Sequence, residues 1–167
     1  MPGYWVRSLP QGRFAGRESF RQHVRDALAW AAHEGWPELV LSDPDFHDWP
    51  LGERAVEQSL HAWARAGRQC TVLAADFGAV QRLHARFVQW RGTWSHIVVC
   101  HKAAGAPPQE VPSAIWSPGW VLHRIDVPRC VGMAGPEPDR RVLLRQSLDE
   151  WLLRRSSPGF PATTLGL

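Results

Sequence analysis

The sequence is short of lysine, cysteine and long apolar runs, and each shortage excludes a class of protein. Lys102 is the one lysine, so the other 18 of the 19 Lys and Arg residues are arginine. Cys70, Cys100 and Cys130 have no CxxC spacing, which argues against a disulfide framework and a zinc site. No apolar run reaches membrane-spanning length, and the first residues lack a signal-peptide pattern. We therefore expect a cytoplasmic protein without membrane contact.

Common catalytic signatures are missing as well. The chain contains no Gly-x-Ser-x-Gly, no glycine-rich phosphate loop and no His-Glu-x-x-His. Serine hydrolases, P-loop enzymes and common zinc proteases would therefore lack essential parts. His123 and Asp126 are close in sequence, but a lone histidine in a strand is more often structural.

Arginine and tryptophan are what the chain has in excess. The net charge is +3 and the pI is about 9.1. Guanidinium groups suit phosphate and carboxylate, yet a GC-rich genome also favours arginine over lysine, and we prefer the genomic explanation. The ten tryptophans serve cores, interfaces and stacking surfaces alike, so their number assigns no function.

The length of 167 residues and the hydrophobic content of 44% suit one domain with one core. We expect this domain to occupy residues 1–167, with the core in about 17–155 and a tail in 156–167. Four segments have apolar residues at helical spacing. They begin at the capping-box sequence Ser19–Gln22, at Gly52, at Asp76 and near Pro138, and their core-facing residues are Phe20, Val24, Ala27, Leu28, Ala31, Val56, Leu60, Trp63, Ala64, Val80, Leu83, Phe87, Trp90, Leu144, Leu148, Trp151 and Leu152.

Short apolar runs between these segments predict strands. The runs are 38–42, 70–75, 97–100, 114–116 and 120–122, and the turn Ser117–Pro118–Gly119 predicts a hairpin between the last two. Helices and strands alternate in the first hundred residues. This order predicts an α/β three-layer sandwich with a mostly parallel or mixed central sheet.

The segment after the first of these strands contains four titratable residues, Asp43, Asp45, His47 and Asp48. Asp76 follows the next strand, and ligands of parallel α/β sheets bind at the carboxyl ends of strands. Carboxylates in such a crevice suit Mg²⁺ and a phosphate substrate. The order Asp43-Pro44-Asp45 resembles the opening of haloacid-dehalogenase-like phosphatases, and this resemblance implies a nucleophile at Asp43 and an acid and base at Asp45.

The same loop has a structural interpretation, which we favour. Asp before Pro begins turns, and Glu53 favours the first turn of the following helix electrostatically. Phe46, Trp49 and Leu51 are expected to hold the loop on the core. The paired acid and the later lysine of the phosphatases have no counterpart near Asp126.

A second candidate site lies between Asp76 and Glu110, where no carboxylate occurs. Cations interleaved with aromatic rings are the elements of an anion or single-strand nucleic-acid surface. The candidate ligand-binding residues are Arg82, Arg86, Arg91, Trp90 and Trp94. Arg82 and Arg86, four residues apart, are expected to share one helix face. The alternative is a solvated helix face that pairs with the acidic loop.

The order of the elements resembles phospholipase D-like domains. The segments that carry the resemblance are FRQHVRDALAWA, ERAVEQSLHAWARAG, RLHARF and DEWLL, which span about Arg17 to Arg155. The catalytic His-x-Lys motif with its later Asp is absent, because His101 and Lys102 are adjacent and His123 has no lysine beside it. The resemblance implies a degenerate, non-hydrolytic domain that keeps an anion-binding crevice.

The apolar tail, with Phe160, Leu165 and Leu167, is expected to fold back on its own domain or to support a homodimer. Taken together, the sequence predicts a non-catalytic binding module without a cofactor, for an anionic ligand or a protein partner. Nucleic acid is possible as a ligand but not favoured. The alternative is a Mg²⁺-dependent phosphoryl hydrolase that uses Asp43, Asp45 and Asp76, with Asp43 and Asp45 as metal ligands.

Overall fold

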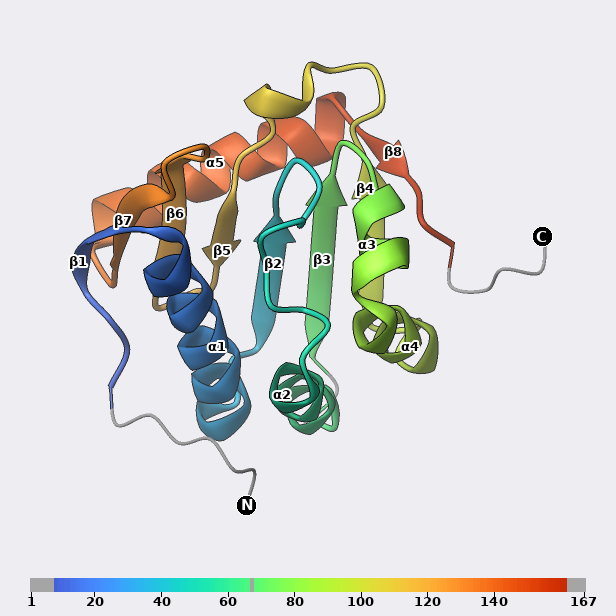
Figure 1. Ribbon diagram of the computed structural model, residues 1–167, viewed down its shortest axis with the longest axis horizontal. Helices are drawn as coiled ribbons and strands as arrows, with labels where there is room; N and C mark the ends of the chain where they lie inside the picture. The colour runs from blue at the N-terminus through green and yellow to red at the C-terminus, as the bar shows by residue number, and fades with distance from the viewer. Residues whose placement is uncertain (1–7, 67, 162–167) are drawn as a thin grey trace.

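A mixed sheet of eight strands lies at the centre of the computed structural model, which describes residues 8–66 and 68–161 (Figure 1). The strand order is β1-β7-β6-β5-β2-β3-β4-β8. The strands are β1 (Gly12–Ala15), β2 (Glu38–Ser42), β3 (Gln69–Ala74), β4 (Val98–Lys102), β5 (Ala114–Trp116), β6 (Val121–Asp126), β7 (Val131–Gly135) and β8 (Ser157–Pro158). The neighbours β2, β3 and β4 are parallel, and the remaining pairs are antiparallel. The expected mixed sheet is confirmed.

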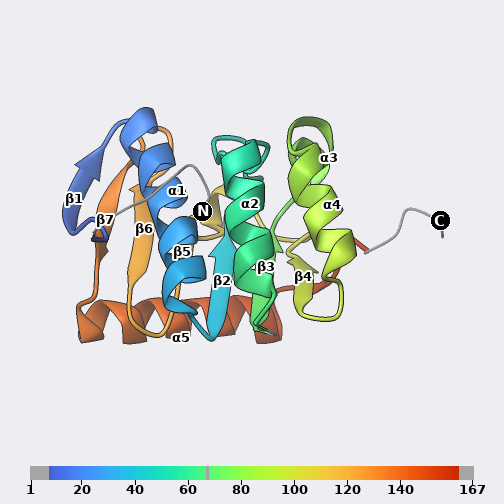
Figure 2. The same ribbon diagram turned by 90° about the horizontal axis from the view of Figure 1, so that it is seen from below.

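Helices cover both faces of the sheet. They are α1 (Arg17–Glu34), α2 (Arg54–Ala64), α3 (Gly78–Leu83), α4 (Ala85–Thr93) and α5 (Pro138–Arg154), with a short 3₁₀ helix at Pro108–Glu110. Figure 2 shows α1, α2, α3 and α4 on one face and α5 crossing the strands on the other. This is the predicted three-layer arrangement. None of the described helices is both long and apolar enough to cross a membrane.

The five predicted strands correspond to β2 through β6, and β5 and β6 form the predicted antiparallel hairpin. Three strands were not predicted. β1 and β7 are short and contain glycine, and β8 has two residues, so their sequences show no clear apolar alternation. They pair because their neighbours in the sheet present open edges.

The predicted capping box at Ser19 is wrong. β1 turns directly into α1 at Gly16, whose φ of 101° is in the left-handed region that favours glycine. The helix therefore begins at Arg17, and Ser19 lies inside its first turn. The predicted inner face of α1, from Phe20 to Ala31, is buried as expected.

The helix expected to follow Asp76 is broken in two. The chain leaves helical geometry at His84, with φ −124° and ψ 56°, so α3 and α4 are separate helices. The His84 ring is buried and its Nε2–H donates to the carbonyl of Phe46 at 2.8 Å. Leu83, predicted to face the core, is 49% exposed because the break turns it outward.

The described part of the tail folds back on the domain. Phe160 is buried and stacks on Phe77, with ring centroids 4.7 Å apart. β8 pairs with the end of β4. Leu165 and Leu167, and Gly67 at the expected end of the second helix, lie outside the described residues.

Candidate functional site

The structure does not assemble the predicted anion-binding residues into one surface. Trp90 is fully buried beside Phe87, and Trp94 is half-buried and donates its Nε1–H to Nδ1 of His61 at 2.9 Å. Arg82 is exposed on α3, whereas Arg86 belongs to α4. The break at His84 therefore removes the single helix face that Arg82 and Arg86 were predicted to share.

Two of the three arginines have structural contacts. Arg86 donates to the carbonyl of Gly52 at 2.9 Å and lies 3.7 Å from the carboxylate of Glu57. Arg91 is 8% exposed and donates to the carbonyls of Val98 and Phe160. It thereby satisfies a carbonyl of β4 where β8 does not reach. The carboxylate-free segment is thus explained in part by arginines that bind backbone carbonyls.

The loop between β2 and α2 is held by Asp43. Its Oδ2 accepts the backbone N–H groups of Asp45 and Phe46, at 3.1 and 2.8 Å. Its Oδ1 accepts a hydrogen bond from Arg124 at 2.9 Å, and the Asp43 side chain is 1% exposed. Phe46, Trp49 and Leu51 are fully buried, as expected of a loop held on the core.

Arg124 is the residue of this site that the sequence did not indicate. Its NH1 group donates to Asp48 at 2.9 Å and to the sulfur of Cys130, while its Nε–H donates to Oγ of Ser113. The guanidinium also lies over the ring of Phe20, 4.2 Å from its centroid. We call Asp43, Asp48 and Arg124 the arginine clamp. It joins β6 to the loop between β2 and α2.

Local irregularity of the sheet accompanies the inward position of Arg124. The β6–β7 register shifts between His123 and Asp126. At this point Gly132 of β7 lies so close to β6 that an added Cβ would be 2.0 Å from the carbonyl oxygen of His123. A charged residue within a strand and a glycine opposite it are the signals in the sequence that point to such a site.

The clamp keeps its charges. Burial by itself would raise the pKa of Asp48, but the hydrogen bond and charge of Arg124, with His47 and Arg17, hold it below the ordinary value. Burial by itself would lower the pKa of Arg124, but Asp43, Asp48 and Cys130 raise it. The cluster is therefore a buried ion pair whose partners are fully hydrogen-bonded.

This arrangement disfavours the phosphatase-like role of the loop. Both oxygens of Asp43 already accept hydrogen bonds from the protein, so a nucleophile or a Mg²⁺ ligand at this position would have to break the clamp. Asp45 caps its own loop, with Oδ1 accepting the N–H of His47, and Asp76 accepts the N–H of Gly78. Within the described residues, no group of three histidine, cysteine or acidic side chains is placed to hold a metal.

A cleft of about 750 Å³ lies beside the clamp, between three loops at this edge of the sheet. Its walls include Asp45, Pro108, Ile125 and Pro128, and Arg124 also lines it. Arg124 is 1% exposed in its side chain and its charge faces two carboxylates. An anionic ligand would meet carboxylates here rather than a free cation.

The residues of the phospholipase D-like resemblance are also apart. His101 is on β4 and His123 is on β6, and three strands lie between them in the sheet. Four strand spacings correspond to roughly 19 Å. Burial lowers the pKa of both histidines, and the charge of Arg140 lowers that of His123 further.

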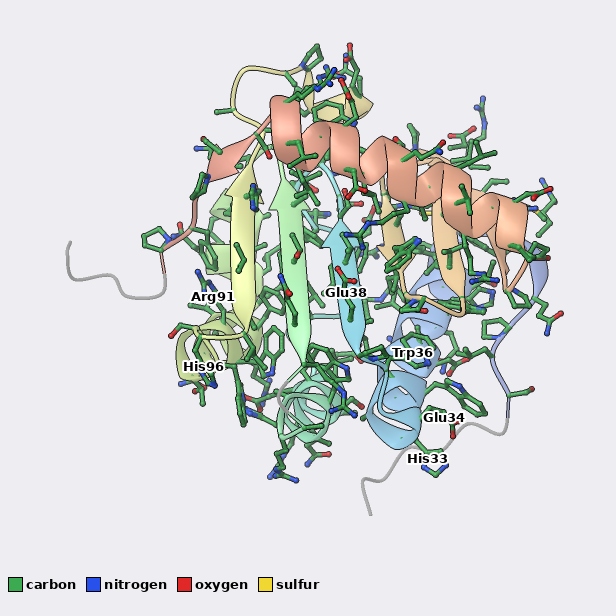
Figure 3. The ribbon with its side chains drawn as sticks, turned by 180° about the vertical axis from the view of Figure 1, so that it is seen from behind. His33, Glu34, Trp36, Glu38, Arg91 and His96 are labelled. Carbon is green, nitrogen blue, oxygen red and sulfur yellow. The ribbon has the colours of Figure 1, made fainter. Side chains whose placement is uncertain are left out.

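On the sheet face that carries α5, the parallel strands are incompletely covered. Val40, Thr71 and Val99 are side by side in register on β2, β3 and β4, and they are 0%, 8% and 40% exposed. The covering helix α5 packs Leu144 and Leu148 against Val40 but does not reach Val99. Figure 3 shows α5 crossing the upper parts of these strands and leaving their lower parts open.

We call Gln69, Thr71, Ile97 and Val99 the open sheet half. A hollow of about 610 Å³ lies here, bounded by Pro37, Arg68 and His96. Arg68 donates to the carbonyls of Gly35, Trp36 and Ala66 and has no carboxylate partner among the described residues. His96 and Glu38 lie on either side of this region in Figure 3. The hollow therefore combines the apolar side chains of Ile97 and Val99 with the polar Gln69 and has a cationic edge at Arg68.

Neither a known protein family nor a curated protein matches the sequence. Among solved structures, the fold is similar to that of TrmBL2, described as an archaeal chromatin protein with a novel mode of DNA binding. The TM-score is 0.62 at 10% sequence identity. The match covers 88% of this chain and 54% of TrmBL2, so the chain spans about half the length of that protein. At this identity the likeness shows the fold alone.

Proposed function

We propose that this domain is a non-catalytic interaction module that binds an amphipathic helix of a partner protein on its open sheet half. The observation that carries the proposal is the row from Val40 to Val99, along which exposure rises from 0% to 40% within one face of a parallel sheet. Parallel strands are ordinarily covered by helices on both faces. The domain supplies that cover over one half of the face and lacks it over the other.

The chemistry of the missing helix follows from the surface. α5 provides the template, because it covers its half with Leu144, Leu148 and Trp151 at helical spacing. A partner helix would place apolar residues over Ile97 and Val99. The unneutralised charge of Arg68 at the edge of the hollow favours a carboxylate on that side of the partner.

The non-catalytic part of the proposal is supported by the arginine clamp. The strand-end carboxylate best placed for chemistry, Asp43, is committed to the loop and to Arg124. The carboxylates at this edge of the sheet then have a structural role in place of the phosphatase-like one. The hydrolase with Mg²⁺ becomes the less favoured alternative.

Site-specific photo-crosslinking tests the partner surface. A benzoylphenylalanine at position 99, in the cells from which the protein comes, is expected to form a discrete adduct, while the same residue at position 153 serves as a control on the exposed side of α5. The partner found in this way, once purified, should bind the Val99→Asp variant about tenfold or more weakly, because a carboxylate would be buried without a partner. Equal affinity for wild type and Val99→Asp would contradict the proposal, as would the absence of an adduct specific to position 99.

A second candidate is nucleic-acid binding, favoured by the DNA-binding description of TrmBL2 and by the net charge of +3. Arg82 on α3 and Arg86 on α4 are the two exposed arginines of the predicted set. If they bind phosphates, Arg82→Ala with Arg86→Ala should weaken the binding of a short single-stranded oligonucleotide and flatten its salt dependence. Fluorescence anisotropy at low and at physiological salt measures both. Arg154→Ala on α5 is the matched control, and equal loss in that variant would rule out a specific role for the pair.

A further inference from the structure

A separate groove of about 300 Å³ is walled by tryptophan on the side of the molecule where β5 turns into β6. Its walls include Leu9, Gln11, Trp30, Trp36, Trp120 and Pro136. Trp36 and Trp120 stack with ring centroids 6.1 Å apart and planes 30° apart, and Figure 3 shows Trp36 near the start of β2. Trp120 is only 3% exposed, so the accessible aromatic surface of the groove comes from the half-buried Trp30 and Trp36.

The hydrogen-bonding state of the rings distinguishes this groove from the core. Trp120 donates its Nε1–H to the carbonyl of Pro10 at 3.0 Å, so its indole is satisfied within the domain. Trp30 and Trp36 are half-buried, and neither N–H donates to another described residue or is closed off from solvent. Among the described residues, these two indole N–H groups beside the groove have no acceptor.

The groove also lacks charge. None of the described residues that line it is acidic or basic. A charged ligand would lose hydration without gaining an ion pair, so the lining favours a neutral ligand. The ligand must offer flat apolar faces for the rings and hydrogen-bond acceptors for the indoles.

We propose that this groove binds a proline-rich peptide segment in the polyproline II conformation. Such a segment meets each requirement, because its pyrrolidine rings pack on aromatic faces and its backbone carbonyls have no internal hydrogen bonds. The conformation is formed before binding, so little ordering entropy is lost. This site is independent of the open sheet half.

Nuclear magnetic resonance of the ¹⁵N-labelled full chain tests the assignment through the indole N–H signals. The probe is an acetylated, amidated proline octamer, with a glycine-serine octamer as the control peptide. We expect saturable shifts of the Trp30 and Trp36 Nε1–H signals and no shift of Trp94, whose N–H is bonded to His61 outside the groove. The glycine-serine peptide should cause none of these shifts.

Ring-conserving variants separate hydrogen bonding from packing. Trp30→Phe and Trp36→Phe each keep an aromatic ring and remove one hydrogen-bond donor. Each should therefore weaken the binding of the proline octamer by about three- to tenfold. Trp94→Phe is the control and should keep the wild-type affinity. Absence of saturable shifts at millimolar octamer would overturn the proposal, and shifts caused by maltohexaose but not by the octamer would replace the peptide with a carbohydrate ligand.

Discussion

The arginine clamp joins the loop after β2 to β6, whereas the open sheet half lies at β3 and β4, and the physical states of the two regions are opposite. In the clamp, Arg124 and Asp43 are almost completely buried, Asp48 is 26% exposed, and Arg124 contacts both carboxylates at 2.9 Å. In the open sheet half, Val99 is 40% exposed, whereas Val40 in the same row is fully buried. Saturated polar groups indicate a structural role, whereas an exposed apolar side chain on a sheet face is a surface that the proposed partner helix could cover.

The largest effect on stability is expected when the cation of the arginine clamp is removed. Arg124→Met would leave Asp43 and Asp48 without their buried partner, and we expect unfolding to become easier by about 3–5 kcal/mol. Urea denaturation followed by circular dichroism measures the loss. Arg129→Met removes the exposed pair with Asp126 and should leave the free energy of unfolding almost unchanged. Equal losses in the two variants would mean that the clamp contributes no more than a surface ion pair.

The second test compares the covered and the open halves of the face. Leu148 is fully buried under α5, so Leu148→Ala should lower the free energy of unfolding by about 2–5 kcal/mol. Val99→Ala should lower it by less than about 0.5 kcal/mol in the isolated domain, because the side chain is already in contact with water. The same denaturation experiment measures both variants. A large loss in Val99→Ala would show that the open half is already packed in solution.

Asp26 is a third case, because it is a partly buried carboxylate with no cationic partner among the described residues. Burial raises its pKa to about 6 from 3.8, and its hydrogen bond comes from Gln22. The folded state therefore holds the proton more tightly than the unfolded state, and this residue makes stability fall as pH rises from about 4 to about 6.

Asp26→Asn keeps the shape of the neutral form and should remove this contribution. Raising the pKa from 3.8 to about 6 corresponds to roughly 3 kcal/mol, which solvent screening of a half-buried group reduces to about 1 kcal/mol. We expect the variant to be more stable than wild type by about this amount above pH 6 and equally stable below pH 4. Thermal unfolding across this pH range checks it, and a pH-independent difference would assign the effect to packing instead.

The regular elements were predictable because their signals are local. The inner face of α1 and the apolar run of β2 each follow from spacing within a few residues. The break between α3 and α4 at His84 was not predictable, because it depends on a hydrogen bond to Phe46, a residue 38 positions away in the sequence. The predicted pairing of Arg82 with Arg86 was wrong for the same reason.

The candidate sites were less predictable than the fold. Asp43 was noticed for its place after a strand, but its role depends on Arg124, 81 positions later in the chain. Arg91 was selected as a ligand-binding residue, because helical spacing alone does not show that its side chain is buried against β4 and the tail. Trp90 was predicted both to face the core and to belong to the ligand-binding set, and it is buried in the core.

The sequence by itself determined the α/β class, the five central strands, the amphipathic helices and a loop held by Phe46, Trp49 and Leu51. Tertiary structure decided which polar groups are satisfied and which apolar groups remain uncovered. The physical reason is that periodicity is set by neighbours along the chain, whereas burial and charge pairing are set by contacts between distant segments. The clamp, the open sheet half and the tryptophan groove exist only once β6, α5 and the turn after β5 are packed against the parallel strands.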